Sequence, residues 1–252
     1  MALRGSSGST PTVGKYSVIV RIDMPDRFRL GLRLGRLSRL VRPTFKALGS
    51  EVELNVQELL TTAALRHGGA PYKRNHAILK ETALWQGWLG VHEAGPLAGR
   101  LLVGGANHGR GNSARLSEFS CSLAESVSLA FMVDVLKIPM ASIVRIPERG
   151  TEAMDFRSSL PGGSAIEAKG RHGNQINPTR KIIAKQMRRQ KVATTKYGCI
   201  VCYERDGSTE LAEEGSFVYI YDPKSDSRSA HLIDDILGHY LRVAQSIGFW
   251  FL

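Results

Sequence analysis

The sequence predicts an α/β protein with a mixed β-sheet flanked by helices, and three observations carry this prediction. From residue 116 onward, the patterns follow the order helix, three strands, helix, two strands, helix. The run KYGCIVCYE (196–204) is apolar without alternation, as in a strand covered on both faces. The stretch HLIDDILGHYLRVAQSI (231–247) has apolar residues at helical spacing. Such a succession is typical of layered α/β architecture.

The N-terminal part of the chain is predicted to be an elaboration on this core. Residues 1–15 read as a flexible tail, and KYSVIVRID (15–23) as a strand. In DRFRLGLRLGRLSRLVRP (26–43), arginines and leucines share a helical stripe, although two glycines weaken a helix. Further helices are expected over 52–66 and 77–89, and glycine-rich 90–111 is expected to be a flexible connection. The expected division is therefore 1–15, 16–112 and 113–252.

The elements of the 113–252 part are placed by their caps and turns. A helix is expected over 116–138, with Ser117 as N-cap and Phe119, Leu123 and Val127 on its apolar side. Strands are expected over 141–148, 152–159 and 164–170, the last two joined by the turn sequence LPGG (160–163). Asn177 as N-cap and Pro178 at the first helical position predict the next helix. Strands over 196–204 and 215–223 follow.

The charge of the chain favours an anionic partner. Thirty-four Lys and Arg against 23 Asp and Glu leave a net charge of +11. Nucleic acid is the commonest partner of so basic a protein, and DNA is favoured over RNA. The alternative is a basic surface that serves only solubility. Whether the chain forms a homodimer or a larger assembly stays open.

The cysteine content and hydropathy indicate a cytoplasmic protein. Three cysteines are too few for a disulfide framework, which favours a reducing compartment. Cys199 and Cys202 lack the second pair that a zinc site needs and lie on opposite faces of a strand, so both are expected to be core residues. The first residues carry no apolar signal-peptide core. No apolar run approaches the roughly 18–20 residues that span a bilayer, so no stable membrane insertion is expected.

The stretch SAIEAKG contains the candidate chemistry. Alternation along a strand points Glu167 and Lys169 to one face, with Ile166 and Ala168 on the other. If the LPGG turn is centred on Pro161, Asp155 lies opposite Glu167, at a Cβ separation of about 5 Å. A centre between Pro161 and Gly162 would pair Asp155 with Ala168 instead, which places its side chain on the wrong face.

Two carboxylates brought so close together call for a cation between them. Mg²⁺ or Mn²⁺ would be held by Asp155 and Glu167, with the backbone carbonyl of Ala168 as a further ligand. Lys169 would then orient or deprotonate an attacking water or stabilise charge on a phosphate. The arrangement predicts phosphodiester hydrolysis.

Asp155, eleven intervening residues and Glu167-Ala168-Lys169 resemble the signature of the PD-(D/E)xK nucleases, which include many restriction endonucleases. The resemblance covers roughly 116–223 and extends to the element order, although Met154 replaces the family's proline. It implies a restriction-endonuclease-like core and an Mg²⁺-dependent nuclease. It also implies a carboxylate from the preceding helix, Glu125 or, second, Glu118, and a polar residue from the following helix, Gln186 or Gln190. A basic surface near phosphate would comprise Arg171, Arg180, Lys181, Lys185, Arg188 and Arg189.

Simpler interpretations accompany these predictions. Asp155, Glu167 and Lys169 could form an ordinary salt bridge on an exposed sheet face. The chain could be a nucleic-acid-binding or assembly protein with the same fold and no catalysis. Its basic leucine-rich segment could instead serve a membrane surface or a protein partner. His172 is expected to be a surface residue.

Overall fold

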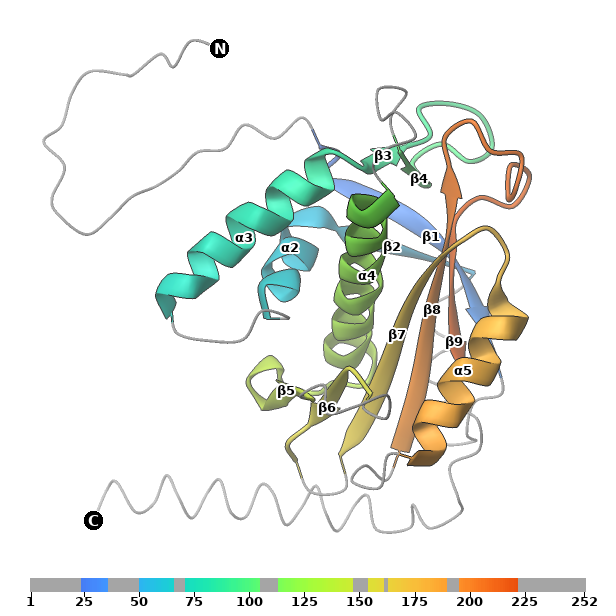
Figure 1. Cartoon of the computed structure of the whole chain (residues 1–252). Coiled ribbons are helices and arrows are strands. Elements are labelled where there is room, and N and C mark those ends of the chain that lie inside the picture. The colour runs from blue at the N-terminus through green and yellow to red at the C-terminus, as the bar shows by residue number, and fades with distance from the viewer. Residues whose placement is uncertain are drawn as a thin grey trace, which may run out of the picture.

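The computed structural model describes residues 24–35, 50–65, 71–104, 113–146, 154–160, 163–189 and 195–221. They form a mixed sheet of nine strands with four α-helices, which confirms the predicted α/β class (Figure 1). The predicted tail 1–15, strand 15–23 and final helix 231–247 lie outside the described residues.

The sheet is built around two parallel strand pairs. Its main order is β2-β1-β9-β8-β7-β6-β5, with β1–β9 and β7–β8 parallel and the other pairs in this path antiparallel. A short hairpin, β3 with β4, joins the end of β8 through parallel pairing of β4. The strands are β1 Arg27–Leu34, β2 Glu51–Asn55, β3 Leu89–Val91, β4 Leu101–Val103, β5 Ile143–Arg145, β6 Phe156–Ser158, β7 Ser164–His172, β8 Thr195–Arg205 and β9 Phe217–Tyr221.

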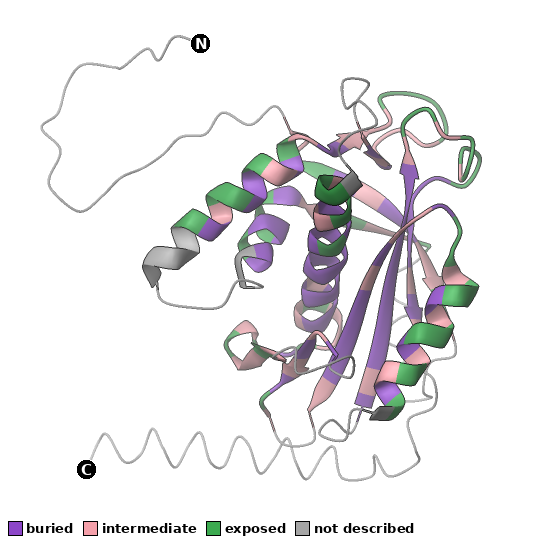
Figure 2. Ribbon diagram, viewed as in Figure 1, coloured by how far each residue is buried: buried purple, intermediate pink, exposed green. Residues whose placement is uncertain are grey.

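Helices cover both faces of the sheet. One face carries α2 (Val56–Leu65), α3 (Pro71–Gln86) and α4 (Ser113–Ala130), and the other carries α5 (Ile176–Arg189) (Figure 1). The larger apolar cluster lies under α4 and combines side chains from β1, β7, β8 and β9. A smaller cluster under α5 contains Ile183 and Met187. Figure 2 shows the purple, buried residues concentrated in β7, β8 and the inner side of α4.

The predicted order of the core elements is confirmed. From α4 the chain runs through the meander β5-β6-β7, crosses the sheet by α5 and returns as β8 parallel to β7. Strand β8 is buried along nearly its whole length, as its unbroken apolar run predicts. The N-terminal strands β1 and β2 extend this same sheet through β9, and their side chains enter the same apolar cluster.

The helical interpretation of the basic leucine-rich segment is wrong for residues 27–34, which form β1. Phe28 and Leu30 are buried and Leu32 half-buried on one face, whereas Arg27 and Arg29 alternate with them. The spacing therefore has a period of two, and Gly31 and Gly35, which disfavour a helix, are compatible with it. Residues 36–49 lie outside the described part of the chain.

Several predicted boundaries also shift. The segment 52–66 divides into β2 and α2, and glycine-rich 90–111 contains β3 and β4 rather than being only a connection. Helix α4 begins at Ser113, one turn before the predicted cap Ser117, and continues into a π-helical turn at Phe131–Val135. Helix α5 begins at Ile176, so Asn177 lies inside its first turn. Short polar stretches leave such helix ends weakly determined.

The span Ala114–Val135 is long and apolar enough, by length and composition, to cross a membrane, which corrects the expectation that no stretch reaches that hydropathy. Within its most apolar window, 67% of the residues are buried in the fold. The core helix of a layered protein meets the same criterion, because one side packs on the sheet and the other on neighbouring helices. The finding is therefore weak evidence for a membrane span.

We expect Gly170→Ala to destabilise the protein by about 1–3 kcal/mol, the usual cost of overpacking. Helix α4 approaches β7 so closely at this point that a β-carbon on Gly170 would overlap the carbonyl and hydroxyl oxygens of Ser120. Urea denaturation measures the loss. As a control, Gly95→Ala adds a methyl group where no atom lies within 4 Å and incurs only the strain of its positive φ. Equal losses in the two variants would contradict the close approach.

Candidate nuclease site

The register of the β6–β7 hairpin is the one that the candidate site requires. Phe156 pairs with Ile166 and Arg157 with Ala165. The ladder ends at Phe156, and the Asp155 amide donates to the carbonyl of Ile166, one step off the regular register, so Asp155 lies beside β7 without a ladder partner of its own. Five loop residues, 159–163, separate the strands, and the Gly163 amide donates to the Leu160 carbonyl at 3.0 Å. Of the two turn centres that the sequence left open, the strand register is the one centred on position 161, and not the one between positions 161 and 162.

Asp155 is tied to β7 on both sides of Glu167. Its backbone amide donates to the Ile166 carbonyl at 3.1 Å, and its carboxylate oxygen Oδ2 accepts from the Ala168 amide at 2.8 Å. In a strand, the amide and carbonyl groups of every second residue face the same neighbouring strand. Ile166 faces β6, so the carbonyl of Ala168 faces the same side, just past the last residue pair of the two strands. The carboxylate and this carbonyl therefore lie at one place on the strand edge.

Glu167 and Lys169 form an ion pair within β7. The ammonium of Lys169 contacts Oε1 of Glu167, with the Lys169 side chain 23% exposed and that of Glu167 fully buried. Within the described residues, neither carboxylate oxygen of Glu167 accepts a hydrogen bond of regular geometry. The prediction that both side chains share a face is confirmed, but this face is not the exposed one of an ordinary surface salt bridge.

Burial raises the pKa of both carboxyl groups, and repulsion from a second carboxylate adds to it in each case. The pKa of Glu167 rises to about 7, chiefly through burial and then through the Asp155 carboxylate, against the attraction of Lys169. Burial also raises the pKa of Asp155, although Lys169 and the Ala168 amide counteract it. Burial alone would lower the pKa of Lys169, but the two carboxylates outweigh that effect and the net shift is upward. Lys169 is therefore an ammonium at neutral pH.

Glu125 reaches this place from α4, as the resemblance implies. Its charge raises the pKa of Asp155, and its own carboxylate is paired with Arg145 of β5, at 3.2 and 3.5 Å between oxygens and guanidinium nitrogens. Glu118 lies two turns away along α4 and pairs with Lys80 of α3 at 2.9 Å. The structure thus brings Glu125, and not Glu118, to the candidate site.

Arg145 is a site residue that the sequence analysis missed. It pairs with Phe156 across β5 and β6, which places it beside Asp155 and lowers the pKa of that carboxyl. Its position follows only from the β5–β6 register. The connection between these strands, 146–155, is too long for its Pro147 and Gly150 to set that register from the sequence.

Gln186 lies on α5, which covers the face of the sheet opposite to α4, and approaches Glu167 from that face. Its side chain bonds to Glu167 closely enough to lower the pKa of that carboxyl, while its own Oε1 is buried and accepts no hydrogen bond from a described residue. The alternative, Gln190, lies outside the described residues. The five predicted catalytic positions therefore converge from four elements: Asp155, Glu167, Lys169, Glu125 and Gln186.

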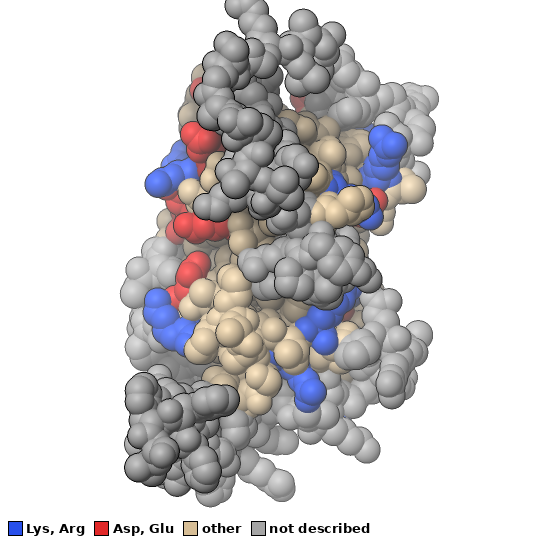
Figure 3. All heavy atoms as spheres, turned by 90° about the vertical axis from the view of Figure 1, so that its left-hand side faces the viewer, with Lys and Arg blue, Asp and Glu red and all other residues tan. Residues whose placement is uncertain are grey.

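The predicted basic residues divide into two groups. Arg171 bridges β7 and α5 by donating to the Gly170 carbonyl at 2.8 Å and to Thr179 Oγ1 at 3.2 Å. Arg180 lies over the ring of Tyr221, 4.8 Å from its centre. Lys181, Lys185 and Arg188 are exposed on the outer face of α5, and α5 ends at Arg189. The opposite side of the molecule differs: in Figure 3 basic side chains lie scattered beside acidic ones.

The donor set fits a divalent cation, although the carboxylates are engaged elsewhere. Among the described residues, no three His, Cys, Asp or Glu side chains already lie in metal-holding geometry. Glu125 is turned to Arg145, Glu167 to Lys169 and Asp155 to the Ala168 amide. Carboxylate and carbonyl oxygens are the ligands that Mg²⁺ prefers, and the buried carboxylate of Glu167, beside that of Asp155 and the Ala168 carbonyl, is of this kind. The residues therefore fit the ion by chemistry.

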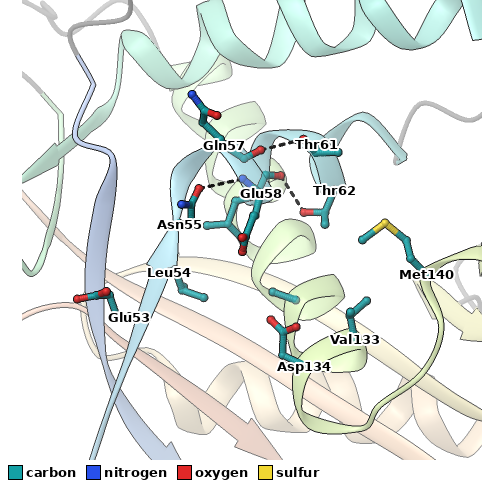
Figure 4. A pocket seen from close by; sticks show the side chains of 12 residues that line it. Glu53, Leu54, Asn55, Gln57, Glu58, Thr61, Thr62, Val133, Asp134 and Met140 are labelled. Carbon is teal, nitrogen blue, oxygen red and sulfur yellow. Dashed lines mark hydrogen bonds between the residues drawn. The ribbon is translucent and has the colours of Figure 1, made fainter.

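A second place with acidic residues has different properties. A pocket of about 480 Å³ lies between α2 and the end of α4, lined by Glu53, Glu58 and Asp134 and by no basic side chain (Figure 4). The hydrogen bonds drawn there are local to α2, such as Glu58 N to Asn55 Oδ1 at 3.1 Å. An anionic ligand would be repelled here, so this pocket does not serve phosphate chemistry.

Cys199 and Cys202 are core residues, as expected. Both are fully buried, Cys199 under α4 and Cys202 under α5, and neither forms a disulfide. Burial raises the pKa of Cys199 to about 12 and that of Cys202 to about 11. His172 is about one third exposed, with Nδ1 3.9 Å from Glu210, consistent with the predicted surface position.

Glu167→Gln should change how stability depends on pH. Because the folded carboxyl has a pKa of about 7 against its ordinary value of 4.5, the native state binds more protons between these values, and the free energy of unfolding falls as pH rises through them. We expect this fall, up to about 3 kcal/mol, to be missing in the variant. Denaturant titrations across that range measure it. Glu118→Gln is the control and should keep the wild-type slope; an unchanged slope in Glu167→Gln would contradict the raised pKa.

Comparison of the chain with protein-family models, with curated proteins and with solved structures found no match. The resemblance to the PD-(D/E)xK nucleases therefore depends on the Asp155 and Glu167-Ala168-Lys169 motif and on the element order. Those two features, with the geometry around them, carry the functional argument.

Proposed function

We propose that the protein is a metal-dependent nuclease with a restriction-endonuclease-like core that hydrolyses phosphodiester bonds in DNA. The observation that carries the proposal is the convergence of Asp155, Glu167 and Lys169 at the point where β6 begins beside β7. Glu125 from α4 and Gln186 from α5 approach the same point from the two faces of the sheet. Neighbouring carboxylates with raised pKa values are typical of functional sites.

Asp155, Glu167 and the Ala168 carbonyl would hold Mg²⁺ or Mn²⁺. The ion would offset the repulsion between the two carboxylates and polarise a phosphate oxygen. Binding requires both carboxyl groups to be ionised, and Glu167, with its pKa of about 7, is the group that loses its proton near neutral pH. Glu125, now paired with Arg145, supplies a further carboxylate within reach of Asp155.

Lys169 serves as a cation rather than as a base. Its raised pKa keeps the ammonium protonated at neutral pH, so it donates hydrogen bonds and cannot accept a proton from water. An ammonium in this position orients the attacking water and stabilises negative charge on the phosphate under attack. Its pairing with Glu167 holds the side chain along β7, at the edge of the carboxylate group.

The choice of substrate rests on charge. The net charge of +11 and the exposed cations on the outer face of α5 favour a polyanion. Lys181, Lys185 and Arg188 lie on the helix that also carries Gln186. A phosphate backbone lying along these cations would pass the flank of α5 that faces Glu167.

Lys169→Ala should reduce DNA cleavage with Mg²⁺ or Mn²⁺ by about 100-fold or more, since it removes a charge aimed at the reacting phosphate. Binding of DNA measured without divalent cation should change little, because exposed cations elsewhere dominate it. Plasmid nicking and fluorescence anisotropy measure the two effects. Lys181→Ala is the matched control. It should weaken DNA binding by a larger factor than it lowers the rate at which bound DNA is cleaved.

Absence of cleavage of DNA or RNA by the wild-type protein with either metal would contradict the proposal. If such a protein still bound nucleic acid in a salt-sensitive way, the result would favour the alternative: a nucleic-acid-binding or assembly protein with the same fold and no catalysis. Equal activity of the Lys169→Ala variant would remove Lys169 from the site.

Asp155→Asn and Glu167→Gln should each weaken Mn²⁺ binding by at least about tenfold, because each removes an anionic oxygen ligand. Loss of the free-ion signal in electron paramagnetic resonance measures Mn²⁺ binding without reference to cleavage. The control is Glu118→Gln, whose carboxylate pairs with Lys80 and should leave affinity unchanged. Wild-type affinity in both site variants would show that the ion binds elsewhere.

A further inference from the structure

A second recess lies on the flank of α5 opposite Glu167. It has a volume of about 460 Å³ and is lined by Asn177, Arg180, Lys181, Ala184 and Tyr221. Four of these residues lie within two turns of α5 and the fifth ends β9. Both cations in its lining come from α5, so an anionic group is attracted to it.

The ring of Tyr221 lines this recess, and that of Tyr219 lies next to it on β9. Tyr219 and Tyr221 lie on one face of β9 with nearly parallel rings, 6.4 Å between centres and 29° between planes. The guanidinium of Arg180 lies over both, 5.8 Å from the Tyr219 ring centre and 4.8 Å from that of Tyr221. Both tyrosines are half-buried, so ring surface remains accessible. A planar group can stack on the accessible ring surface beside the guanidinium.

The outer face of α5 connects this recess with the carboxylate site. Successive helix positions turn by about 100°. Ile183 and Met187 are buried against the sheet, Gln186 faces Glu167, and Arg180 faces β9. Between these two flanks, on the side away from the sheet, lie the exposed cations Lys181, Lys185 and Arg188. A phosphate chain crossing this face would have the carboxylates on one flank and the tyrosines on the other.

We infer that this recess binds an unpaired base of single-stranded nucleic acid, stacked on Tyr221 beside Arg180, while Lys181 contacts the adjoining phosphate. The inference rests on the proposed function, for which it specifies the form of the substrate. Every base has a flat π-face, but that face is free only outside a duplex. A duplex would offer α5 its phosphates and leave the rings unused. The recess therefore distinguishes single from double strands.

The test measures binding without cleavage. Fluorescence anisotropy with chelator present compares the full-length Lys169→Ala protein on an oligonucleotide, its RNA counterpart and its duplex. In this background, Tyr221→Leu should weaken single-strand binding about tenfold, the loss of one stacked base, and duplex binding less than twofold. Tyr221→Phe keeps the ring and should bind like the parent. Lys181→Ala should weaken both forms alike, whereas Arg115→Ala, at the exposed start of α4, is the matched charge control and should change neither.

The outcomes separate this inference from the nuclease proposal. Single-strand binding that is unaffected by Tyr221→Leu, or weakened equally on single strand and duplex, would overturn the inference, whether or not the wild-type protein cleaves. Thermal unfolding of each variant checks that the fold is retained, and Tyr221→Phe repeats the test with minimal change of shape. A ring-dependent preference for single strands in a protein that cleaves nothing would support the recess and contradict the nuclease.

Discussion

The register of one short hairpin determines where the residues of the candidate site lie. The hydrogen bond from the Ala168 amide to the Asp155 carboxylate ties the start of β6 to β7 around Glu167. A slip of one residue would exchange the two faces of the strand, moving Ile166 and Ala168 out of the apolar cluster and Glu167 into it. The core beneath α4 therefore enforces the same register that groups the carboxylates, so packing and chemistry select one pairing.

The sequence predicts the elements from α4 to β9 better than it predicts Arg145 or segment 27–34. The α4–β9 order and the shared face of Glu167 and Lys169 follow from alternation and turn residues, which are local signals, whereas the place of Asp155 depended on where the LPGG turn is centred. Arg145 could not be predicted, because its place depends on a strand pairing across the long connection 146–155. Segment 27–34 was misassigned because arginines and leucines at mixed spacing fit a helical stripe as well as an alternating strand, and only pairing with β2 and β9 decides between them.

Helix α5 links the parts of the proposed substrate surface. It packs on the sheet through Ile183 and Met187, directs Gln186 to Glu167 and directs Arg180 to the tyrosines of β9. Because both flanks belong to one rigid helix, the spacing between them is fixed by the helix and the strands β7, β8 and β9 beneath it. Strands β1 and β2 extend that sheet beyond β9, so the N-terminal elements support the platform on which α5 lies.

The burial of Glu167 argues against a purely structural salt bridge. An exposed cross-strand pair costs little and contributes little, but Glu167 is fully buried beside a second carboxylate, and its pKa of about 7 shows that ionising it is unfavourable. A structural role would be served at lower cost by an apolar side chain, as replacements of buried ion pairs show. Local features that reduce stability are typical of functional sites, where another requirement overrides stability. In the proposed function, that requirement would be met by a cation held between the carboxylates, which would offset the repulsion that Lys169 offsets only in part.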